Sequence, residues 1–568
     1  MTALDLACSA TATRGAESSG PADSIVAVLV DVATVSNDTS ADSATPDTSS
    51  TDETLAALDI APEDLAGPDT PSDVDADLVP DTVAEPDLPF TEPDADAASE
   101  PDAPTELDAL ADADTAQGSE VSPDAVTVTV EPLSVAEVEA LLESTDAAGV
   151  AALVADWDGP VCDASGCVIV STAKSGVAVT ALGGFNDWSD QSALTLKQSV
   201  ADADTYWATL EPPPSTPTPY KLKHDGEWTL DPSNPYVLFG GFGFDSALTP
   251  PGYGRITVVP DVASPQLSNS RDLFVYLPAA YFTDLDARFP VLYLNDGKNV
   301  FQNPKAPFGS WDVEVTADAL NAAAQTAPVI FVGVDTNDRM AEYSYAPIDL
   351  GDGPIPPKGA LYADFLADTV RPVVDGQFRT RTETSVTGIA GSSLGGIISM
   401  YVAWVRPDAF GRVGSFSGAY WVGEEAAGEP VGPSMRGLIE ENEGAVPPGS
   451  LRVYIDSGDT TSGGGVGYAS DSWAYSDWTR NALIGQGWDN RAEWDTDGVL
   501  ATAPTNLPES TDPSDVPHVS WTEPPPSGTW LGASKNLLSV VGHGHQHNES
   551  AWKQRFAVAL RFLYPSGE

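Results

Sequence analysis

The sequence predicts a multidomain α/β protein in which a long acidic segment and a β-sandwich precede a mostly parallel sheet flanked by helices. Three observations predict this. Nearly all the charged side chains of the first 130 residues are acidic. Short alternating segments follow from about residue 165. From about residue 253 there are short apolar runs separated by helix-compatible stretches. A chain of 568 residues is too long for one hydrophobic core. We place the predicted boundaries at 1–128, 129–252 and 253–568.

The first segment differs from the rest of the chain in its charge. Residues 1–130 hold about 30 acidic side chains and one basic side chain, Arg14, which is about half of the formal net charge of −60. This stretch is rich in Asp, Ala, Pro, Thr and Ser and nearly free of aromatic residues, so it can bury too little apolar surface to offset the entropy of ordering. We predict a disordered acidic tether. Because the remainder is also acidic, we expect no nucleic-acid partner.

Three cysteines bear on the cellular compartment. Cys162 and Cys167, in CDASGC, are spaced to close a small loop in an oxidising environment. Cys8 precedes the long tether, as in a bacterial lipoprotein, although Asp5 stands where lipid-attachment signals carry an apolar residue. The apolar run at 25–32 is too short to span a membrane. We expect an exported protein, extracellular, cell-surface or periplasmic, with membrane attachment only through a lipidated Cys8.

The middle of the chain has the pattern of an immunoglobulin-like β-sandwich preceded by a helix. Residues 134–157 show helical spacing of Val, Leu and Ala. Short alternating segments follow at intervals of roughly 10–15 residues, and Gly, Pro and Asp turns separate them. These segments read CVIVSTA, VAVTALGGF, TYWATLEPP and YKLKHDGEW.

From about residue 253 the pattern becomes that of an α/β sheet. Short apolar runs alternate with helix-compatible stretches, which predicts a mostly parallel sheet with helices on both faces. Ligands of such sheets bind beyond the carboxyl ends of the strands, and the unusual residue clusters of this chain follow such runs. A polar insertion at 489–534 is either a disordered loop or part of a lid. The runs are RDLFVYLPAAY, FPVLYLNDGKNVF, APVIFVGVDTNDR, TSVTGIAGSS, GRVGSFSGAYW, LRVYIDSGD and NLLSVVGHG.

The segment TGIAGSSLGGIISM carries the strongest chemical signal. Residues 391–395, GSSLG, fit G-x-S-x-G between an apolar strand and an apolar helix, which is the setting of a nucleophile elbow. The glycines let strand and helix approach closely, so Ser393 protrudes near the helix N-terminus. Backbone N–H groups there can hold an oxyanion. We predict that Ser393 is a nucleophile.

A serine nucleophile needs a base, and this fold places a histidine late in the chain. Three of the five histidines, His543, His545 and His547, fall in one loop after the last apolar run. The H-x-H-x-H pattern can also bind zinc or copper. No further cluster of metal ligands stands out in the sequence, so we predict neither a metal site nor a cofactor.

The acid that orients the histidine is expected after LRVYIDSGD. Asp456, Asp459 and Asp471 are the candidates. Asp456 lies within the strand end, where a structural role is an alternative. Asp471 opens DSWAYSDWTRNALIGQGW and can sit at a helix N-terminus facing the site.

Residues 255–565 resemble a family of α/β-hydrolases that includes esterase D, enterochelin and other siderophore esterases, feruloyl and acetyl-xylan esterases and mycolyltransferases. The resemblance implies an α/β-hydrolase domain that transfers an acyl group in two steps without a cofactor. The phrases that carry it are RDLFVYLPAAY, FPVLYLNDGKNVF, RMAEY, GSSLGG, FGRVGSFSGAYW and HNESAWKQRFAVALRFLYP.

The resemblance also implies roles for individual residues. The family's nucleophile falls on Ser393 and its histidine on His547, and the family pattern favours Asp471 over Asp459 as the acid. The substrate it implies is an acyl or feruloyl ester on a polysaccharide, or a siderophore ester. The implied oxyanion donors are the backbone N–H groups of Leu394 and of Gly297 or Lys298.

The β-module resembles the early-set carbohydrate-binding modules of glycogen-branching enzymes and of the AMP-activated kinase β subunit. GGFNDWSD, YWATLEPP and YKLKHDGEWTLDPSNPYV carry this resemblance. It implies that a sugar stacks on Trp188 and Trp228 and meets Lys221. Two alternatives are that both tryptophans are core residues, or that the module only shapes the active site.

Three functions follow from these patterns. The first is a serine carboxylic-ester hydrolase, and the second is a non-catalytic surface protein that binds carbohydrate on a hydrolase scaffold. The third is an acyltransferase of the mycolyltransferase type. Arg339 and Glu342, in RMAEY, are expected either to form a structural ion pair or to line the substrate cleft.

Overall fold

The structure is a computed structural model that describes residues 133–349, 353–424, 432–442, 444–458, 473–488, 490–491, 493–494, 500–501, 536–542 and 545–567. The chain divides into two units, 1–120 and 121–568. Every described residue belongs to the second unit, so the predicted tether and Cys8 lie outside the described residues. Most of the insertion predicted at 489–534 also lies outside them.

The predicted helical stretch at 134–157 forms two helices, α2 (Val135–Leu142) and α3 (Ala147–Ala155). Ser134 begins α2 with a capping box, because its hydroxyl accepts from the Glu137 N–H while the Glu137 carboxylate accepts from the Ser134 N–H at 2.8 Å. Apolar residues of both helices pack with buried side chains of the strands that follow.

The segments that alternate in the sequence form antiparallel strands. One set pairs β1 with β2, β2 with β5, and β5 with β4. A second set pairs β4 with β3, β3 with β6, β6 with β7 and β9, and β9 with β8. The strands are β1 (Val161–Cys162), β2 (Cys167–Thr172), β3 (Val179–Gly183), β4 (Leu194–Gln198), β5 (Thr205–Leu210), β6 (Thr218–His224), β7 (Glu227–Thr229), β8 (Tyr236–Gly240) and β9 (Gly243–Leu248).

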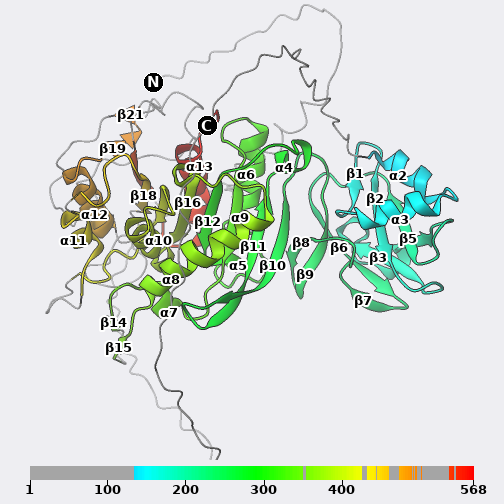
Figure 1. Cartoon of the computed structure of the whole chain (residues 1–568), viewed down its shortest axis with the longest axis horizontal. Helices are drawn as coiled ribbons and strands as arrows, with labels where there is room; N and C mark the ends of the chain where they lie inside the picture. Colours follow the sequence, from blue (N-terminus) through cyan, green and yellow to red (C-terminus); the bar gives the residue numbers. More distant parts are fainter. Residues whose placement is uncertain are drawn as a thin grey trace, which may run out of the picture. The chain divides into compact units, whose positions relative to one another are not determined.

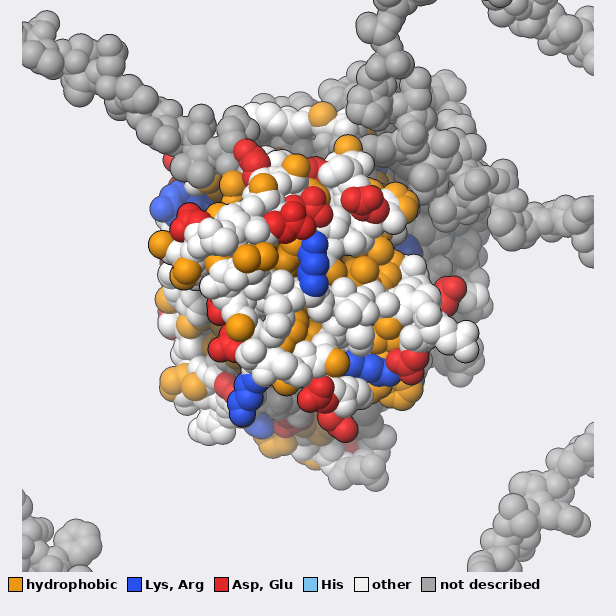
Figure 2. All heavy atoms as spheres, turned by 90° about the vertical axis from the view of Figure 1, so that its right-hand side faces the viewer, with side chains coloured by type: hydrophobic (Ala, Val, Ile, Leu, Met, Phe, Trp, Pro, Cys, Tyr) orange, Lys and Arg blue, Asp and Glu red, His pale blue; other side chains and the backbone are white. Residues whose placement is uncertain are grey.

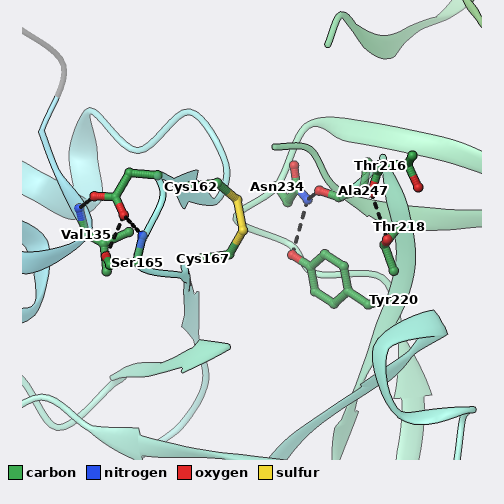
Figure 3. The surroundings of a disulfide bond; sticks show 10 residues. Val135, Cys162, Ser165, Cys167, Thr216, Thr218, Tyr220, Asn234 and Ala247 are labelled. Atoms are coloured by element: carbon green, nitrogen blue, oxygen red, sulfur yellow. Dashed lines mark hydrogen bonds between the residues drawn. A yellow bond between two sulfur atoms is a disulfide. The ribbon is translucent and has the colours of Figure 1, made fainter. Parts of the chain in front are cut away.

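A disulfide joins Cys162 and Cys167 across the β1–β2 pair, as the spacing predicts (Figure 3). Asp163, inside the loop that the disulfide closes, accepts hydrogen bonds from the Ser165 N–H at 2.7 Å and the Val135 N–H at 3.0 Å. The loop is therefore tied to the first turn of α2.

On the face shown in Figure 2, acidic and basic side chains lie among hydrophobic and neutral ones, and no large patch of one sign covers it.

The second half of the described chain forms a mixed sheet, which confirms the predicted α/β class (Figure 1). Its order is β10–β11–β13–β12–β16–β17–β18–β22, where the first two pairings are antiparallel and the others parallel. β8 adds antiparallel to β10. The strands are β10 (Arg255–Ser264), β11 (Asn269–Leu277), β12 (Val291–Asn295), β13 (Ile330–Val334), β16 (Thr387–Ser392), β17 (Arg412–Phe416), β18 (Arg452–Gly458) and β22 (Leu537–Gly542), and short strands are β14 (Ile348–Asp349), β15 (Pro354–Ile355), β19 (Asn490–Arg491), β20 (Glu493–Trp494) and β21 (Leu500–Ala501).

Alternate residues of the sheet enter two different cores. Val291 and Tyr293 pack with side chains of α8, α10, α11 and α12, whereas Leu292 and Leu294 pack with side chains of α6 and α13. No helix among the described residues is both long and apolar enough to cross a bilayer. The helices are α4 (Ala280–Thr283), α5 (Gly297–Val300), α6 (Val313–Ala322), α7 (Arg339–Glu342), α8 (Gly359–Phe365), η4 (Leu366–Val370), α9 (Arg371–Gln377), α10 (Leu394–Val405), α11 (Met435–Glu440), α12 (Trp473–Gly485) and α13 (Glu549–Leu563).

Candidate active site

The parallel strands bring distant residues to one edge of the sheet. Asp296 follows β12, Ser393 follows β16, Ser417 follows β17, and His547 lies in the loop after β22. Since the carboxyl ends of neighbouring parallel strands share one edge, these residues gather at the place where α/β sheets bind ligands.

Ser393 occupies a strained turn between β16 and α10. Its backbone angles are φ 56° and ψ −121°, a conformation that residues other than glycine rarely adopt. Ser392 is buried in the strand, whereas Ser393 is partly exposed. A Cβ added at Gly391 would lie 2.7 Å from the Gly395 carbonyl oxygen, so the turn requires glycine there. This geometry is the one predicted from the G-x-S-x-G pattern.

Hydrogen bonds to the loop after β17 hold the main chain of Ser393. The Ser393 N–H donates to the Phe416 carbonyl, and the Ala419 N–H donates to the Ser393 carbonyl, both at 2.9 Å. Leu394 is the first residue of α10, where N–H groups have no acceptor within the helix. The Ser393 side chain makes no capping hydrogen bond to the first turn of α10.

The loop after β12, where the second oxyanion donor is expected, is fixed by an ion pair. Arg339 donates Nε and Nη2 to the Asp296 carboxylate at 2.8 and 2.9 Å, and the Asp296 N–H donates to the Tyr343 hydroxyl at 2.9 Å. Gly297 begins α5, and a Cβ there would lie 2.7 Å from the Gly333 backbone, so this position requires glycine. The Lys298 N–H faces Asp335 Oδ1 at 3.4 Å.

Of the two alternatives for Arg339 and Glu342, the ion pair between them is wrong. Glu342 binds Arg271 of β11 instead, with Nη1 2.7 Å from Oε2 and both side chains 1% exposed. Thr336 also donates to Glu342 at 2.8 Å. Arg339 and Glu342 lie in the same helical turn, but their partners, Asp296 and Arg271, come from other strands. The local sequence does not reveal such partners.

His547 packs against the helix that follows it. Its ring meets the Trp552 indole edge to face, with centroids 5.0 Å apart, and Trp552 Nε1 donates to Ser417 Oγ at 2.9 Å. His547 is thus joined through Trp552 to the loop that holds Ser393. His543, Asp459 and Asp471 lie outside the described residues, and the residues that are described contain no cluster of three or more metal-binding side chains.

Asp456, the third candidate acid, is enclosed by structural partners. Arg555 Nε donates to Asp456 Oδ2 at 2.9 Å, and both side chains are fully buried. The Tyr454 hydroxyl and the Ser417 N–H donate to the same carboxylate at 2.7 and 2.9 Å. These contacts give Asp456 the structural role that was one of its predicted alternatives.

Sequence reasoning missed Ser417, Trp552, Arg555 and Glu549. All four stand inside phrases that marked the family resemblance, FSGAYW and HNESAWKQR, so those phrases were the available signal. Glu549 accepts from Asn299 Nδ2 at 3.1 Å. Burial raises the pKa of Glu549, while that hydrogen bond and the nearby charge of His547 oppose the rise.

The antiparallel region comprises α2, α3 and strands β1 to β9. In this region, the two predicted sugar-stacking residues lie on the surface. Trp188 is 38% exposed and Trp228 49% exposed, with ring centroids 6.1 Å apart and planes inclined by 51°. The alternative that both are core residues is therefore wrong. Lys221 pairs with Asp245 at 3.1 Å, and the neighbouring Lys223 places Nζ 4.3 Å from the Trp228 ring centroid.

Comparison with known proteins adds a family match to this geometry. The family model described as "Putative esterase" matches residues 264–509. The uncharacterized protein YbbA of Bacillus subtilis is 29% identical over 195 residues, which are 34% of this chain and 69% of that protein. The iron(III) enterobactin esterase of Dickeya dadantii is 27% identical over 177 residues, 30% of this chain and 35% of that protein.

Solved structures of esterases are also similar to the chain. The enterobactin esterase of Shigella flexneri is 15% identical, with a TM-score of 0.34 over 73% of this chain and 98% of that one. The feruloyl esterase module of Clostridium thermocellum is 16% identical, with a TM-score of 0.36 over 56% and 90%. The family model and the sequence relatives support the esterase family for residues 264–509.

Proposed function

We propose that this protein is a serine carboxylic-ester hydrolase that works through an acyl-enzyme. The observation that carries the proposal is Ser393, held at φ 56° between a buried strand and the N-terminus of α10. Strain of this kind persists only where the surroundings enforce it, and it collects at functional sites. The match of residues 264–509 to an esterase family model supports the same chemistry.

In the proposed mechanism, Ser393 Oγ attacks the ester carbonyl while His547 accepts its proton. The oxyanion then lies at the N-terminus of α10, where the Leu394 N–H and a donor from Gly297 or Lys298 stabilise it. His547 next gives the proton to the leaving alkoxide. Water then attacks the acyl-enzyme while His547 accepts its proton, and His547 returns that proton to Ser393 Oγ as the carboxylic acid is released.

The acid partner of His547 is proposed to be Asp471, with Asp459 as the alternative. Asp456 is a poor choice because its carboxylate already binds Arg555, Tyr454 and the Ser417 N–H. A carboxylate paired with a buried guanidinium has little capacity left to orient an imidazole.

The proposed substrate is an acyl or feruloyl ester on a polysaccharide or a siderophore ester, and the proposed location is outside the cytoplasm. The Cys162–Cys167 disulfide supports an oxidising compartment. Lipid attachment at Cys8, ahead of an acidic tether, is part of the same proposal. An acyltransferase differs only in the acceptor of the acyl group, and product analysis in the presence of sugars separates the two activities.

The test of the hydrolase is hydrolysis of a short-chain nitrophenyl ester together with labelling by a fluorophosphonate. We expect Ser393→Ala to abolish both, with the label mapped to the peptide that contains Ser393. The adjacent Ser392→Ala is the control and should keep both, because that residue is buried in β16. Equal rates of hydrolysis for wild type and Ser393→Ala would rule out Ser393 as the nucleophile, whereas no hydrolysis and no labelling of wild type would favour the non-catalytic binding protein.

A second candidate function, carbohydrate binding by the antiparallel region, rests on the exposed Trp188–Trp228 pair. The two exposed indoles offer apolar faces for pyranose rings, and Lys221, or the neighbouring Lys223 beside Trp228, offers a donor for hydroxyl groups. We propose an early-set, immunoglobulin-like module that holds the catalytic part near polysaccharide. Retention on insoluble starch or xylan that is lost on Trp188→Ala with Trp228→Ala supports this, and Phe242→Ala, at another exposed aromatic, is the control.

A further inference from the structure

We propose that Arg555 is a positioning residue for the reaction assigned above, because one guanidinium joins the loop that holds Ser393 to the loop that carries His547. The inference rests on the proposed function. Arg555 lies on α13 and is fully buried, as is the Asp456 carboxylate beside it. Its hydrogen bonds among the described residues go to Asp456, Ser417 and His545, so we infer that it acts on the reaction through other residues.

The guanidinium of Arg555 reaches the ends of three strands at once. Nε donates to Asp456 Oδ2 in β18 at 2.9 Å, and Nη2 donates to Ser417 Oγ after β17 at 2.8 Å. Nη1 donates to His545 Nδ1 in the loop after β22 at 3.2 Å. The three bonds use three different nitrogens, so the planar group fixes the relative positions of all three loops.

This arrangement needs arginine and not merely a positive charge. A guanidinium presents five N–H donors in a rigid plane, whereas a lysine ammonium is a single point on a flexible stem. Burying a cation is costly, and the buried Asp456 offsets that cost. A simple structural pair would need only the Asp456 contact. The two further bonds go to Ser417, in the loop next to Ser393, and to His545, in the loop that carries His547.

Ser417 transmits the position of Arg555 to the nucleophile. Its backbone is left-handed, with φ 44°, and its N–H donates to Asp456 Oδ1 at 2.9 Å. Phe416 and Ala419, on either side of it, hold the N–H and carbonyl of Ser393. A shift of Ser417 therefore moves the groups that set the main chain of Ser393.

Ser417 also transmits the position of Arg555 to the base. Its hydroxyl oxygen accepts from both Arg555 Nη2 and Trp552 Nε1, at 2.8 and 2.9 Å. The His547 ring packs on Trp552, and His545, two residues earlier, accepts from Arg555. The positions of Ser393 and His547 thus both depend on the Ser417 hydroxyl. Small displacements between a nucleophile and its base lower the rate of the chemical step more than they lower substrate binding.

The experiment compares Arg555→Lys and Ser417→Ala with Arg561→Lys, by steady-state hydrolysis of a nitrophenyl ester and by the rate of fluorophosphonate labelling. Arg561 is the matched control, since it is also buried on α13 but donates to Gln325, away from the site. We expect kcat and the labelling rate to fall about 100-fold for Arg555→Lys and about 10-fold for Ser417→Ala. KM should stay within about 3-fold, and Arg561→Lys should stay within about 3-fold on all three measures.

A readout that does not need turnover accompanies the kinetics. The ¹⁵N and ¹H ring resonances of His547, assigned with His547→Gln, should shift in Arg555→Lys and Ser417→Ala and not in Arg561→Lys. If both site variants match the control in rate and in ring resonances at equal Tm, Arg555 is only a structural residue. If wild type neither hydrolyses esters nor takes the label, the proposed function fails, while the His547 resonances still decide whether Arg555 positions that ring. Ser417→Ala keeps the Asp456–Arg555 pair and serves if Arg555→Lys does not fold.

Discussion

The carboxyl edge of the parallel sheet and the tryptophan face of the antiparallel region use unusual side chains in opposite ways. At the sheet edge, Arg555 and Asp456 are fully buried and bonded to several loops. In the antiparallel region, Trp188 and Trp228 are partly exposed, their rings lie beside each other, and Lys223 lies over the Trp228 ring. The buried Arg555 network fixes the relative positions of side chains, as a catalytic reaction requires. The exposed tryptophan pair instead leaves ring faces accessible, as ligand binding requires.

The difference extends to the ion pairs of the two regions. In the sheet region, Arg271 and Glu342 are both 1% exposed, whereas the Lys197–Glu143 pair of the antiparallel region is about 60% exposed on each side. Breaking a buried pair leaves an uncompensated charge in the interior, while an exposed pair is replaced by water. Changes in the sheet region should therefore cost more.

The largest expected effect is on the proposed base. His547→Gln should lower kcat for a nitrophenyl ester by about 10³-fold or more, because the imidazole that takes the Ser393 proton is lost. His224→Gln, on β6 of the antiparallel region, should leave the rate within about 2-fold. Should His547→Gln remain nearly as active as wild type, another histidine serves as the base and the assignment from the family phrase is wrong.

The next effect concerns the buried ion pair. Arg271→Met should lower the free energy of unfolding by about 3 kcal/mol, since Glu342 is left charged in the interior. Urea denaturation followed by tryptophan fluorescence measures this. Lys197→Met is the comparison in the other region and should change the free energy by less than about 0.5 kcal/mol. Equal losses in the two variants would contradict the contrast drawn between the regions.

A smaller effect depends on pH. Burial raises the pKa of Glu314, on α6, to about 8, while the hydrogen bond from the Gln302 N–H opposes the rise. The folded state therefore holds a proton that the unfolded chain releases near pH 4.5. The stability that Glu314 contributes is complete below that pH and is lost as the pH rises through about 8.

Glu314→Gln should accordingly raise the free energy of unfolding at pH 9 by about 2 kcal/mol and change it little at pH 4.5. Denaturation curves at both pH values provide the measurement. Glu143→Gln, at an exposed carboxylate of the antiparallel region, should show no such difference. A gain of equal size at both pH values would mean that the gain does not come from the ionisation of Glu314.

The smallest effect is expected on the tryptophan face. Trp188→Ala and Trp228→Ala should each lower the free energy of unfolding by less than about 1 kcal/mol, because both rings are partly exposed already. Hydrolysis of a small soluble ester should remain within about 2-fold of wild type. A large loss of either stability or small-ester activity would show that the pair belongs to the interior architecture and not to a binding face.

The local patterns in the sequence predicted the strands, the helices at 134–157 and the turn at Ser393, because each depends on neighbouring residues. Periodicity predicted the helical stretch at 134–157, which the structure divides into α2 and α3, and the glycine spacing predicted the strand-to-helix turn. Strands β2, β3, β5 and β6 also coincide with the alternating segments, whereas β4, β8 and β9 lie outside them. These features depend on hydrophobic spacing and on backbone sterics, and both are determined by residues that are close together in the sequence.

The side-chain network at the sheet edge could not be predicted in the same way. Arg555 and Asp456 are 99 residues apart, and Trp552 and Ser417 are 135 apart. Only the strand order brings such residues together, and the same cause led to the wrong pairing of Arg339 with Glu342. The likeness of FSGAYW and HNESAWKQR to family phrases marked the residues without revealing that they contact one another.

The position of β22 in the sheet has a consequence for biosynthesis. Ser393 can reach its strained turn once β16 and β17 pair, but β22 docks on β18 only after residue 542 has left the ribosome. Until then the proposed base cannot meet the nucleophile. A nascent chain shorter than this therefore lacks the proposed Ser393–His547 pair, and we expect no acyl transfer from it.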